Sequence, residues 1–274
     1  MSPSSAAAPA APPPILLSET RGAVALLTLN RPAARNSLSE ALIAELQQGL
    51  TALGADGSVR AIVIAANGPV FSAGHDLKEL TARRRDPDRG RGYFAQIMTA
   101  CSEMMQAIVR CPKPVIAAVH GVATAAGCQL VASCDLAVAA EGATFATPGV
   151  DIGLFCSTPM VALSRNVPRK HAMHMLMTGE PVSAARAMEL GLVNRVVAAG
   201  TERDAAIALA EAIARKSAHT LKIGKEAFYR QAEMPLQDAY RFAAEVMTEN
   251  MLARDAEEGI NAFIEKRDPT WEDR

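Results

Sequence analysis

Two stretches rich in small residues could place backbone N–H groups against a negatively charged ligand. Residues 71–80 (FSAGHDLKEL, the first stretch) follow an expected strand at 61–65. Residues 121–130 (GVATAAGCQL, the second stretch) follow an expected strand at 114–119. Small side chains let the backbone approach a ligand closely, and the first N–H groups of a helix have no partner within the helix. Each stretch is therefore a candidate anion-binding turn between a strand and a helix.

Two such turns facing each other would form an oxyanion hole, in which paired N–H groups stabilise the charge that develops on a carbonyl oxygen. Losing one donor of such a hole costs about 3–4 kcal/mol of transition-state stabilisation. The same residues also suit two helix starts that pack closely for steric reasons alone. The sequence pattern leaves both interpretations open.

Several common catalytic and binding patterns are absent from the sequence. No expected strand leads into GxGxxG, and neither GxxxxGK[ST] nor GxSxG occurs, so dinucleotide, P-loop and nucleophile-elbow sites are not predicted. His171 and His174 lie three residues apart on an expected helix. No third ligand lies near them in sequence, so we predict no metal site.

The composition narrows the expected partners and location. A net charge of −1 and an aromatic content of 4% argue against a nucleic-acid partner. No apolar run reaches the roughly 18 residues that span a bilayer, so no membrane partner is predicted. The five cysteines include no CxxC pair and are expected to be reduced and buried, as is typical of a cytoplasmic protein.

Apolar patterning predicts the elements that must position the two stretches. Besides the two strands already named, short apolar runs predict strands at 23–29 and 136–139. Ser37 and Glu40 have the spacing of a capping box and predict the start of an amphipathic helix that ends near Gly54. Its apolar residues recur at helical intervals: Leu42, Ile43, Leu46, Leu50 and Leu53.

The chain is expected to have three parts. Residues 1–14 are uncharged and rich in alanine and proline, which predicts a disordered tail. Strands that alternate with helices predict an α/β core over residues 15–200, within which Ser183 caps a helix that stops at Gly191. Residues 201–274 are predicted to be helical. The expected helices there are 202–216, 221–231, 236–252 and 256–266.

The segment 81–92, TARRRDPDRGRG, allows two interpretations. Its arginine, aspartate and glycine content is typical of a solvated, mobile loop. The same cations could also form a basic lid near an anionic ligand.

The two stretches, with their order and spacing, resemble the crotonase superfamily of enoyl-CoA hydratases and isomerases. The resemblance covers about residues 15–267, and one branch of the family is especially similar at residues 123–135 and 145–150. It implies an α/β fold class, with a ββα spiral core and a helical C-terminal trimerisation region. The matching segments are LNRP (29–32), NSL (36–38), residues 71–80, KPVIAAVHG (113–121), CDL (134–136), TGEPVSA (178–184), GLV (191–193), Gly259 and FIEKR (263–267).

The resemblance also implies roles for individual residues. The backbone N–H groups of His75 and Ala126 match the oxyanion hole, and Lys78 matches a lysine near the coenzyme A phosphates. Phe263 and Lys266 match residues by which a neighbouring subunit contacts the adenine nucleotide. The remaining residues assigned to thioester binding are Ala73, Gly74, Asp76, Leu77 and Gly127.

The implied ligand is an acyl-CoA substrate, with no cofactor beyond its coenzyme A moiety. The implied partner is another copy of the chain, in a homotrimer or a dimer of trimers. The metabolic role implied by the family is fatty acid metabolism. The expected location is the cytoplasm, because the cysteines are expected to be reduced.

The chain departs from the hydratases of this family at both acid/base positions. Hydratases grip a water with two glutamates, and the matching positions here are Gln129 and Gly149. Gln129 can hydrogen-bond a water but cannot take its proton, and each missing acid/base is worth about 10²–10⁴ in rate. Asp151 is an alternative base, although a structural hydrogen bond suits it better. We expect slow hydration, which Gln129→Glu with Gly149→Glu should raise.

The possible roles of the His75 side chain leave three functions open for the protein. A similar Ser-Ala-Gly-His-Asp run occurs in methylmalonyl-CoA decarboxylases of this superfamily, whose tyrosine position here falls on Cys156. The His75 imidazole could serve such a reaction, or it could point to solvent. The three candidates are an acyl-CoA enzyme with altered hydratase-like activity, which we favour, a malonyl-type decarboxylase using His75, and an acyl-CoA-binding protein without turnover.

Overall fold

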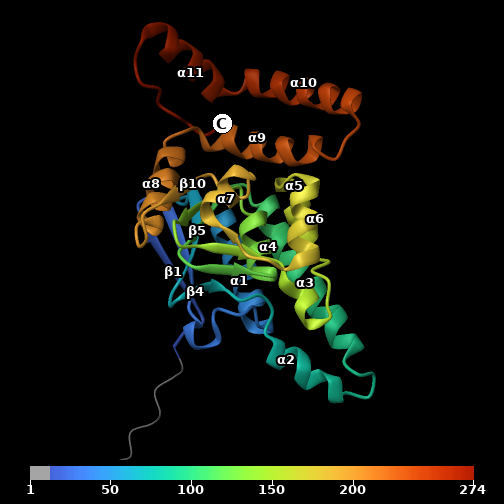
Figure 1. Ribbon diagram of the computed structural model, residues 1–274. Helices are drawn as coiled ribbons and strands as arrows, with labels where there is room; N and C mark the ends of the chain where they lie inside the picture. The colour runs from blue at the N-terminus through green and yellow to red at the C-terminus, as the bar shows by residue number, and fades with distance from the viewer. Residues whose placement is uncertain (1–12) are drawn as a thin grey trace, which may run out of the picture.

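Two β-sheets organise the chain, and the larger has six strands. The computed structural model describes residues 13–274 (Figure 1). In the larger sheet the strand order is β1-β2-β3-β5-β7-β10, with β1 antiparallel to β2 and all other neighbours parallel. The bounds are β1 Leu16–Arg21, β2 Val24–Leu29, β3 Ala61–Ala66, β5 Val115–Val119, β7 Leu136–Ala140 and β10 Arg195–Val197.

The smaller sheet is built from strands that follow those of the larger one. Its order is β4-β6-β8-β9, with β4, β6 and β8 parallel and β9 antiparallel to β8. The chain therefore repeats one unit: a strand of the large sheet, a strand of the small sheet, then a helix. The bounds are β4 Val70–Ser72, β6 Val122–Thr124, β8 Thr144–Ala146 and β9 Val182–Ser183.

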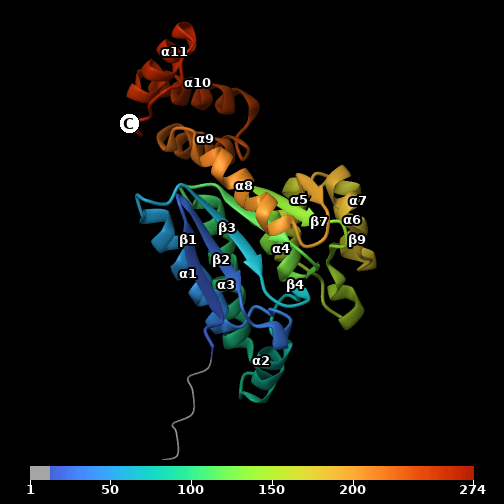
Figure 2. The same cartoon turned by 90° about the vertical axis from the view of Figure 1, so that its left-hand side faces the viewer.

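Helices cover both faces of the larger sheet (Figure 2). Strand β3 shows why, because Ile62 and Ile64 pack into the core on one face while Ala61 and Val63 pack into the core on the other. A strand buried on both faces reads as a continuous apolar run. Helices α1, α3 and α4 pack on the face of Ile62 and Ile64, and α8 packs on the face of Ala61 and Val63. These helices are α1 Glu40–Ala55, α3 Arg91–Arg110, α4 Ala126–Ser133 and α8 Glu202–Ala214.

The start of α1 corrects the predicted cap. Ser39, not Ser37, is the N-cap, and its Oγ accepts a hydrogen bond from the Leu42 N–H at 3.2 Å. Ser37 instead donates to the carboxylate of Asp76 at 3.2 Å. Either serine could cap the helix by residue type. Ser37 is instead held by Asp76, which lies far along the chain, so Ser39 serves as the cap. The predicted cap at Ser183 is confirmed, since its Oγ accepts from the Arg186 N–H at 3.2 Å.

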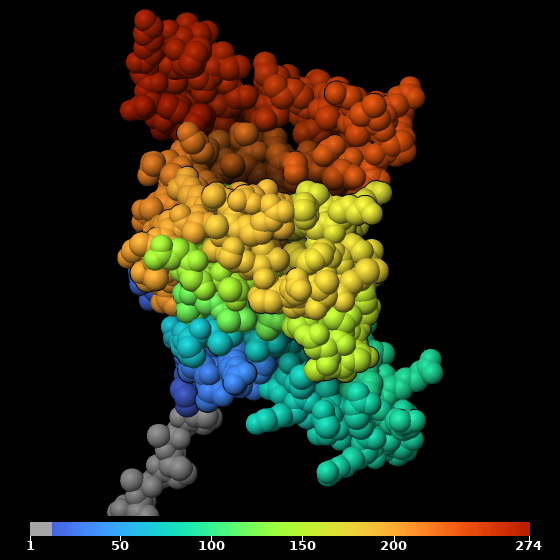
Figure 3. Space-filling view, in the orientation of Figure 1, coloured from blue at the N-terminus to red at the C-terminus, as the bar shows by residue number. Residues whose placement is uncertain are grey.

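The segment 81–92 is helical for much of its length rather than a loop. Helix α2 (Leu77–Ala82) runs into a 3₁₀ turn at Arg83–Arg85, and α3 begins at Arg91. The guanidiniums of Arg83 and Arg84 lie 4.8 Å and 5.8 Å from the ring centres of Tyr93 and Phe94. These cation–π contacts hold the turn against the start of α3. Figure 3 shows this part of the chain projecting from the body.

Three further helices of the body lie beyond the second sheet. The 3₁₀ helix η3 (Pro148–Ile152) follows β8 and leads toward α5. Helix α7 begins at the Ser183 cap and is followed by Gly191, which has a φ of +84°. The helices are α5 Pro159–Asn166, α6 Arg169–Thr178 and α7 Ala184–Glu189.

Helices α9, α10 and α11 form a C-terminal arm that stands apart from the sheets (Figures 1 and 2). Their bounds lie close to the predicted ones, and α8, the first helix predicted after residue 200, packs on the sheet instead. The indole N–H of Trp271 donates to the Arg215 carbonyl at 2.9 Å, which holds the chain end near the body. The helices of the arm are α9 Ala218–Gln231, α10 Leu236–Leu252 and α11 Arg254–Glu265.

Two sequence-based expectations concern the chain's ends and any membrane. The tail expected at 1–14 falls almost entirely on residues 1–12, which lie outside the described residues. Across residues 13–274, no helix combines the length and apolarity needed to cross a bilayer.

Candidate active site

The two small-residue stretches touch each other at Gly74. This residue has a φ of +83°, and a Cβ placed there would lie 2.9 Å from the Ala125 Cβ and 3.1 Å from the Ala126 nitrogen. Only glycine suits both this backbone angle and this spacing. The first stretch thus passes directly against the residue that begins α4.

A second close contact lies one residue further along. A Cβ at Gly127 would collide with the Ser72 carbonyl oxygen. Strands β4 and β6 are paired just before these residues, with Val70 opposite Val122. The pairing therefore sets both stretches in register where they leave the small sheet.

Two backbone N–H groups remain free where the stretches meet. The Leu38 N–H donates to the Gly74 carbonyl at 2.7 Å, and the Asp76 N–H donates to the Leu38 carbonyl at 3.2 Å. Within residues 13–274, the intervening His75 N–H has no hydrogen-bond acceptor, and neither has that of Ala126, the first residue of α4. The site offers two unpaired donors on either side of the Gly74 contact.

The N–H groups of Ala126 and His75 are left without an acceptor for different reasons. The Ala126 N–H is free because it begins a helix. His75 does not begin one, which corrects the expectation for the first stretch: α2 starts at Leu77, and its N-cap Asp76 accepts from the Lys78 N–H at 3.1 Å. His75 is freed instead by its short bridge with Leu38.

Ala125 holds a backbone conformation that alanine rarely adopts. Its φ is +51° and its ψ is −118°, and its N–H donates to the Ala146 carbonyl at 2.9 Å. Such angles cost about 1–3 kcal/mol and persist only when the surroundings impose them. The bend at Ala125 turns the chain from β6 into α4 and so sets the direction of the Ala126 N–H.

Gln129 lies one turn into α4, beside the candidate oxyanion hole. Its side chain is only 5% exposed, and its Oε1 has no hydrogen-bond partner among the described residues. Residues four apart share one helix face, and helical side chains lean toward the N-terminus. Gln129 therefore lies on the same helix face as Ala125, which touches Gly74 and accepts a hydrogen bond from the Gln129 N–H at 3.0 Å.

Gly149, the second acid/base position, has no room for a side chain. It lies in η3, three residues after Ala146. Its φ is outside the left-handed region, but a Cβ would lie 2.9 Å from the Leu154 carbonyl oxygen and 3.0 Å from the Cys156 Sγ. The backbone after η3 thus occupies the space that a glutamate would need.

His75 is the titratable side chain at the meeting point of the stretches. Burial lowers the pKa of its imidazole below the ordinary value, and its Nε2 has no partner within the described residues. Burial also raises the pKa of the Cys156 thiol. Asp151 is exposed, and its carboxylate lies beside Gly179, where a Cβ would be 3.0 Å from its Oδ2.

Asp76 supports the first stretch rather than facing a ligand freely. The Arg31 guanidinium lies 3.1 Å from its carboxylate. Burial opposes the negative charge, yet hydrogen bonds from Arg31, Ser37 and nearby backbone N–H groups together lower the Asp76 pKa. The Ala73 N–H adds a bond to the Arg35 carbonyl at 3.0 Å. Spacing alone gave no sign of Arg31, which lies 45 residues before Asp76.

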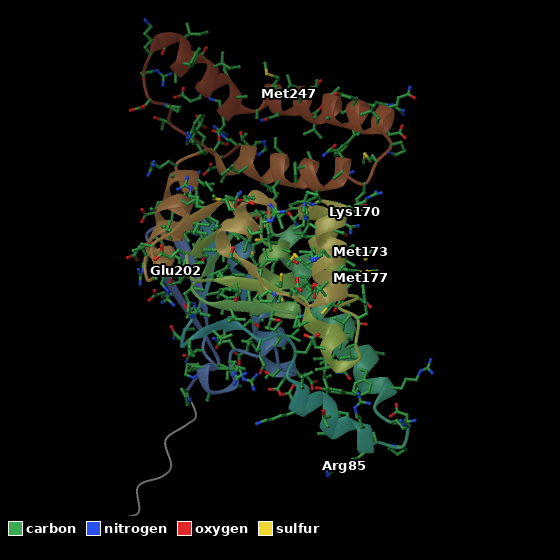
Figure 4. All side chains as sticks on the ribbon, in the orientation of Figure 1. Arg85, Lys170, Met173, Met177, Glu202 and Met247 are labelled. Carbon is green, nitrogen blue, oxygen red and sulfur yellow. The ribbon has the colours of Figure 1, made fainter. Side chains whose placement is uncertain are left out.

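The remaining predicted binding residues lie toward opposite ends of the molecule. Leu77 and Lys78 are exposed on α2, where they line an open hollow with Thr81, Ala82 and Arg85. Arg85, a second cation of this hollow, was not predicted. Phe263 is 86% exposed and Lys266 lies just past α11, on the C-terminal arm. Figure 4 shows Arg85 at one extremity and Met247 of the arm near the other, so one chain does not bring the two groups together.

Comparison with known proteins places this geometry in a family. The model of the enoyl-CoA hydratase/isomerase family matches residues 19–274. A rat protein named enoyl-CoA hydratase domain-containing protein 3, mitochondrial, is 45% identical over 265 residues, which cover 97% of this chain and 87% of the rat protein. The human protein of that name is 47% identical over 245 residues, covering 89% of this chain and 79% of its own.

Solved structures agree with the sequence relatives. An enoyl-CoA hydratase from Mycobacterium smegmatis superposes with a TM-score of 0.90 at 52% identity, covering 94% of this chain and 99% of its own. Human enoyl-CoA hydratase domain-containing protein 3 gives a TM-score of 0.89 at 45% identity, and the match covers 94% of this chain and 100% of the human chain. The crotonase-type α/β fold class is thereby confirmed, and so is the resemblance to this branch, which residues 123–135 and 145–150 had indicated.

The names of the rat and human relatives assign those proteins to mitochondria. The cytoplasmic location expected from the cysteines therefore stays a prediction for this chain. The family assignment does not depend on location. On sequence and on fold, the chain belongs to the enoyl-CoA hydratase/isomerase family.

Proposed function

We propose that this protein binds an acyl-CoA thioester with its carbonyl oxygen between the backbone N–H groups of His75 and Ala126, and stabilises the enolate of that thioester. One observation carries the proposal: among residues 13–274 both N–H groups lack an acceptor, and they flank the contact at Gly74. Family membership supports an acyl-CoA ligand.

The two donors would act on the charge that forms during enolisation. When a proton leaves the carbon next to the carbonyl, negative charge moves onto the carbonyl oxygen. Donors fixed in advance at that oxygen lower the barrier, by a factor of about 10²–10³ in rate for each. The positions of Gly74 and Ala125 fix these donors in the free protein.

Ordinary hydration is the reaction that this site supports least. Gln129 cannot accept a proton from water at neutral pH, and Gly149 offers only backbone. The proton-handling group left beside the oxyanion hole is the His75 imidazole, which burial holds uncharged at neutral pH. We therefore assign enolate chemistry, with weak or altered lyase activity, rather than efficient addition of water.

The coenzyme A moiety would lie toward α2, and it is the only cofactor group in the proposal. Lys78 and Arg85 line one hollow there and offer two cations to its phosphates. Phe263 and Lys266 would reach the adenine from a second copy, because the arm lies far from α2 within one chain (Figure 1). This arrangement requires a second copy of the chain, and the assembly that we propose is a homotrimer or a dimer of trimers.

The experiment measures binding and enolisation separately. Isothermal titration with a non-hydrolysable acyl-CoA analogue should give binding, and free coenzyme A, which lacks the carbonyl, should bind more weakly. Butyryl-CoA incubated with protein in D₂O should gain deuterium next to the carbonyl, as read by mass spectrometry. Absence of binding at millimolar ligand would contradict the proposal, and binding without exchange would indicate a binding protein without turnover.

A decarboxylase is the second candidate, favoured by the Nε2 of His75, which has no hydrogen-bond partner in the described part of the chain. Loss of CO₂ from a malonyl thioester leaves the same enolate, which then needs a proton donor. The lowered pKa of His75 leaves little imidazolium for that step at neutral pH, so we rank this reaction second. Mass analysis of malonyl- and methylmalonyl-CoA after incubation tests it directly, because loss of CO₂ lowers the product mass.

A further inference from the structure

Residues 78–91, which we call the basic protrusion, carry an excess of positive charge. They hold six of the chain's 28 Lys and Arg residues but only three of its 29 Asp and Glu residues. All six cations are exposed, and in the described part of the chain none of them forms a salt bridge. Their charge is therefore available to a partner. The six are Lys78, Arg83, Arg84, Arg85, Arg89 and Arg91.

Two of the three acids in the basic protrusion bind backbone rather than a neighbouring cation. Glu79 accepts a hydrogen bond from the Glu40 N–H at 3.0 Å. Asp88 accepts from the N–H groups of Gly90 and Gly92 at 2.9 Å and 2.7 Å. These bonds hold the shape of the basic protrusion, so its cations are presented on a folded segment rather than on a random loop.

Stability accounts for only some of the cations. Arg83 and Arg84 stack on the aromatic rings at the start of α3. Arg89 has a φ of +59°, an angle that residues other than glycine seldom adopt. Arg91 is the first residue of α3, where the helix dipole disfavours a cation. Neither position favours an arginine for the sake of the fold, and this indicates a role at the surface.

The basic protrusion extends beyond the hollow assigned to coenzyme A. Lys78 and Arg85 line that hollow, whereas Arg89 and Arg91 do not. The segment stands out from the body (Figure 3), with Arg85 at an extremity of the molecule (Figure 4). A small ligand in the hollow would leave the outer cations without contacts. A macromolecule that carries the thioester could contact both the hollow and these cations.

The chemistry of the thioester narrows the kind of macromolecule. Thioesters of phosphopantetheine occur in two forms, on coenzyme A and on acidic carrier proteins. Nucleic acids and membranes are also anionic, but they bring no thioester to the contact at Gly74. Arginine is well suited both to phosphate groups and to the carboxylates of a protein surface.

We propose that the basic protrusion docks an acidic carrier protein, which presents its acyl group to the candidate oxyanion hole as a phosphopantetheine thioester. The phosphate of the arm lies at the hollow, and the acidic surface of the carrier lies against the outer cations. Charge complementarity of this kind orients the partner and makes its binding sensitive to salt. The inference rests on the proposed function, since it assumes that the thioester binds at Gly74.

Three probes test the docking: a butyryl-loaded acyl carrier protein, butyryl-phosphopantetheine and butyryl-CoA. In isothermal titration at about 50 mM NaCl, the wild type should bind the loaded carrier at least about tenfold more tightly than butyryl-phosphopantetheine, which is the same arm without the protein. The difference should shrink at about 500 mM NaCl, because salt screens exposed charges.

The double variant Arg89→Asn with Arg91→Gln removes two outer cations, and asparagine tolerates the positive φ. Its dissociation constant for the loaded carrier should rise about fivefold, while butyryl-CoA binding and the thermal midpoint should not fall. Arg169→Gln with Lys170→Gln is the matched control. It removes two exposed cations at the start of α6, where Figure 4 shows Lys170 far from Arg85, and should leave carrier binding unchanged.

The results distinguish failure of the docking from failure of the proposed function. If none of the three probes binds, the proposed function fails. If butyryl-CoA binds but the carrier binds no more tightly than butyryl-phosphopantetheine, the docking is wrong and acyl-CoA binding stands. This comparison uses only the wild type, so it holds even if a variant folds poorly.

Two further results would overturn the docking. Equal weakening of carrier and butyryl-CoA in the double variant would assign Arg89 and Arg91 to coenzyme A instead. A single-stranded RNA or an anionic lipid vesicle that binds as tightly as the loaded carrier would make the basic protrusion a general surface for polyanions.

Discussion

Lys225 on α9 donates a 2.6 Å hydrogen bond to the carboxylate of Asp135, which directly follows α4 and its C-cap. The same ammonium donates to the carbonyls of Ile108 and Lys113 at 3.0 Å and 2.9 Å. The Tyr229 hydroxyl donates to Asp135 at 2.9 Å. The C-terminal arm is thus joined to the helix whose other end presents the Ala126 N–H.

Removing the cation should destabilise the fold strongly. The Lys225 and Asp135 side chains are 9% and 16% exposed, so Lys225→Met leaves a largely buried carboxylate without its positively charged partner. We expect the free energy of unfolding to fall by about 3–5 kcal/mol, measured by urea denaturation. Arg241→Met, which breaks an exposed pair with Asp238, is the control and should cost no more than about 1 kcal/mol. Equal losses in the two variants would contradict a structural role for Lys225.

Hydration of crotonyl-CoA should be slow in the wild type, well below a rate of about 10 per second. Gln129→Glu supplies one carboxylate beside the oxyanion hole and should raise the rate by a factor of about 10–100. The loss of absorbance of the conjugated thioester measures it. A wild type that hydrates at an ordinary enzymatic rate would require another base, and Asp151 and His75 would be the next residues to replace.

The structure changes what is expected of the double variant. From the sequence alone, adding Gly149→Glu should raise hydration further. The Leu154 carbonyl and the Cys156 thiol now occupy the space beside Gly149, so this glutamate must displace backbone. We expect the double variant to be less stable than Gln129→Glu alone and no faster, as judged by thermal unfolding and the same assay.

Gly74→Ala should disrupt the candidate oxyanion hole. The added Cβ would collide with Ala125 and would force a positive φ on an alanine. The dissociation constant for an acyl-CoA should rise about tenfold or more while the protein stays folded, as checked by circular dichroism. Gly57→Ala is the matched control, because a Cβ there meets nothing within 4 Å and its φ is not positive. Unchanged binding in Gly74→Ala would argue against ligand binding at this contact.

Stability should depend on pH through His75. Its pKa is lowered in the folded protein relative to about 6.5 in the unfolded chain, so the unfolded chain binds the proton more readily. This contribution to stability is fully present above pH 6.5 and is lost as the pH falls from there toward the folded-state pKa. His75→Gln should reduce that loss in urea titrations between about pH 7 and pH 5, whereas His174→Gln, at an exposed position on α6, should not.

The arm should mediate self-association. Its helices expose large apolar side chains in the single chain, and this exposure is typical of surfaces buried between subunits. Light scattering should give about three or six times the chain mass of 28.9 kDa. Changing both Leu236 and Leu252 to aspartate should shift the protein toward a monomer. A wild-type monomer at micromolar concentration would contradict the predicted trimer.

The sequence predicted the buried central strands of the larger sheet well, for a physical reason. Residues 61–65 and 114–119 are buried on both faces and read as unbroken apolar runs, so their strands were predicted to within one residue. The strands of the small sheet span only two or three residues, too few for any periodicity to show. Helix α3 was missed because it begins inside the charged segment 81–92.

The candidate site could be predicted only in part. The small-residue runs marked where backbone could approach a ligand, and the structure brings them into contact at Gly74, although their binding roles stay predictions. Pairs that join distant parts of the chain, such as Asp135 with Lys225, leave no trace in local spacing. The lack of room at Gly149 was also invisible, because it depends on how the chain returns at Cys156.

Trp271 gives the C-terminal arm its own spectroscopic reporter. It is the chain's single tryptophan, its indole N–H is bonded to the Arg215 carbonyl, and its ring packs against Gly259 on α11. Its fluorescence therefore follows release of the chain end, while far-ultraviolet circular dichroism follows the helices and sheets as a whole. Coincident transitions for the two signals would mean that arm and body unfold as one cooperative unit, and an earlier change in fluorescence would mean that the arm detaches first.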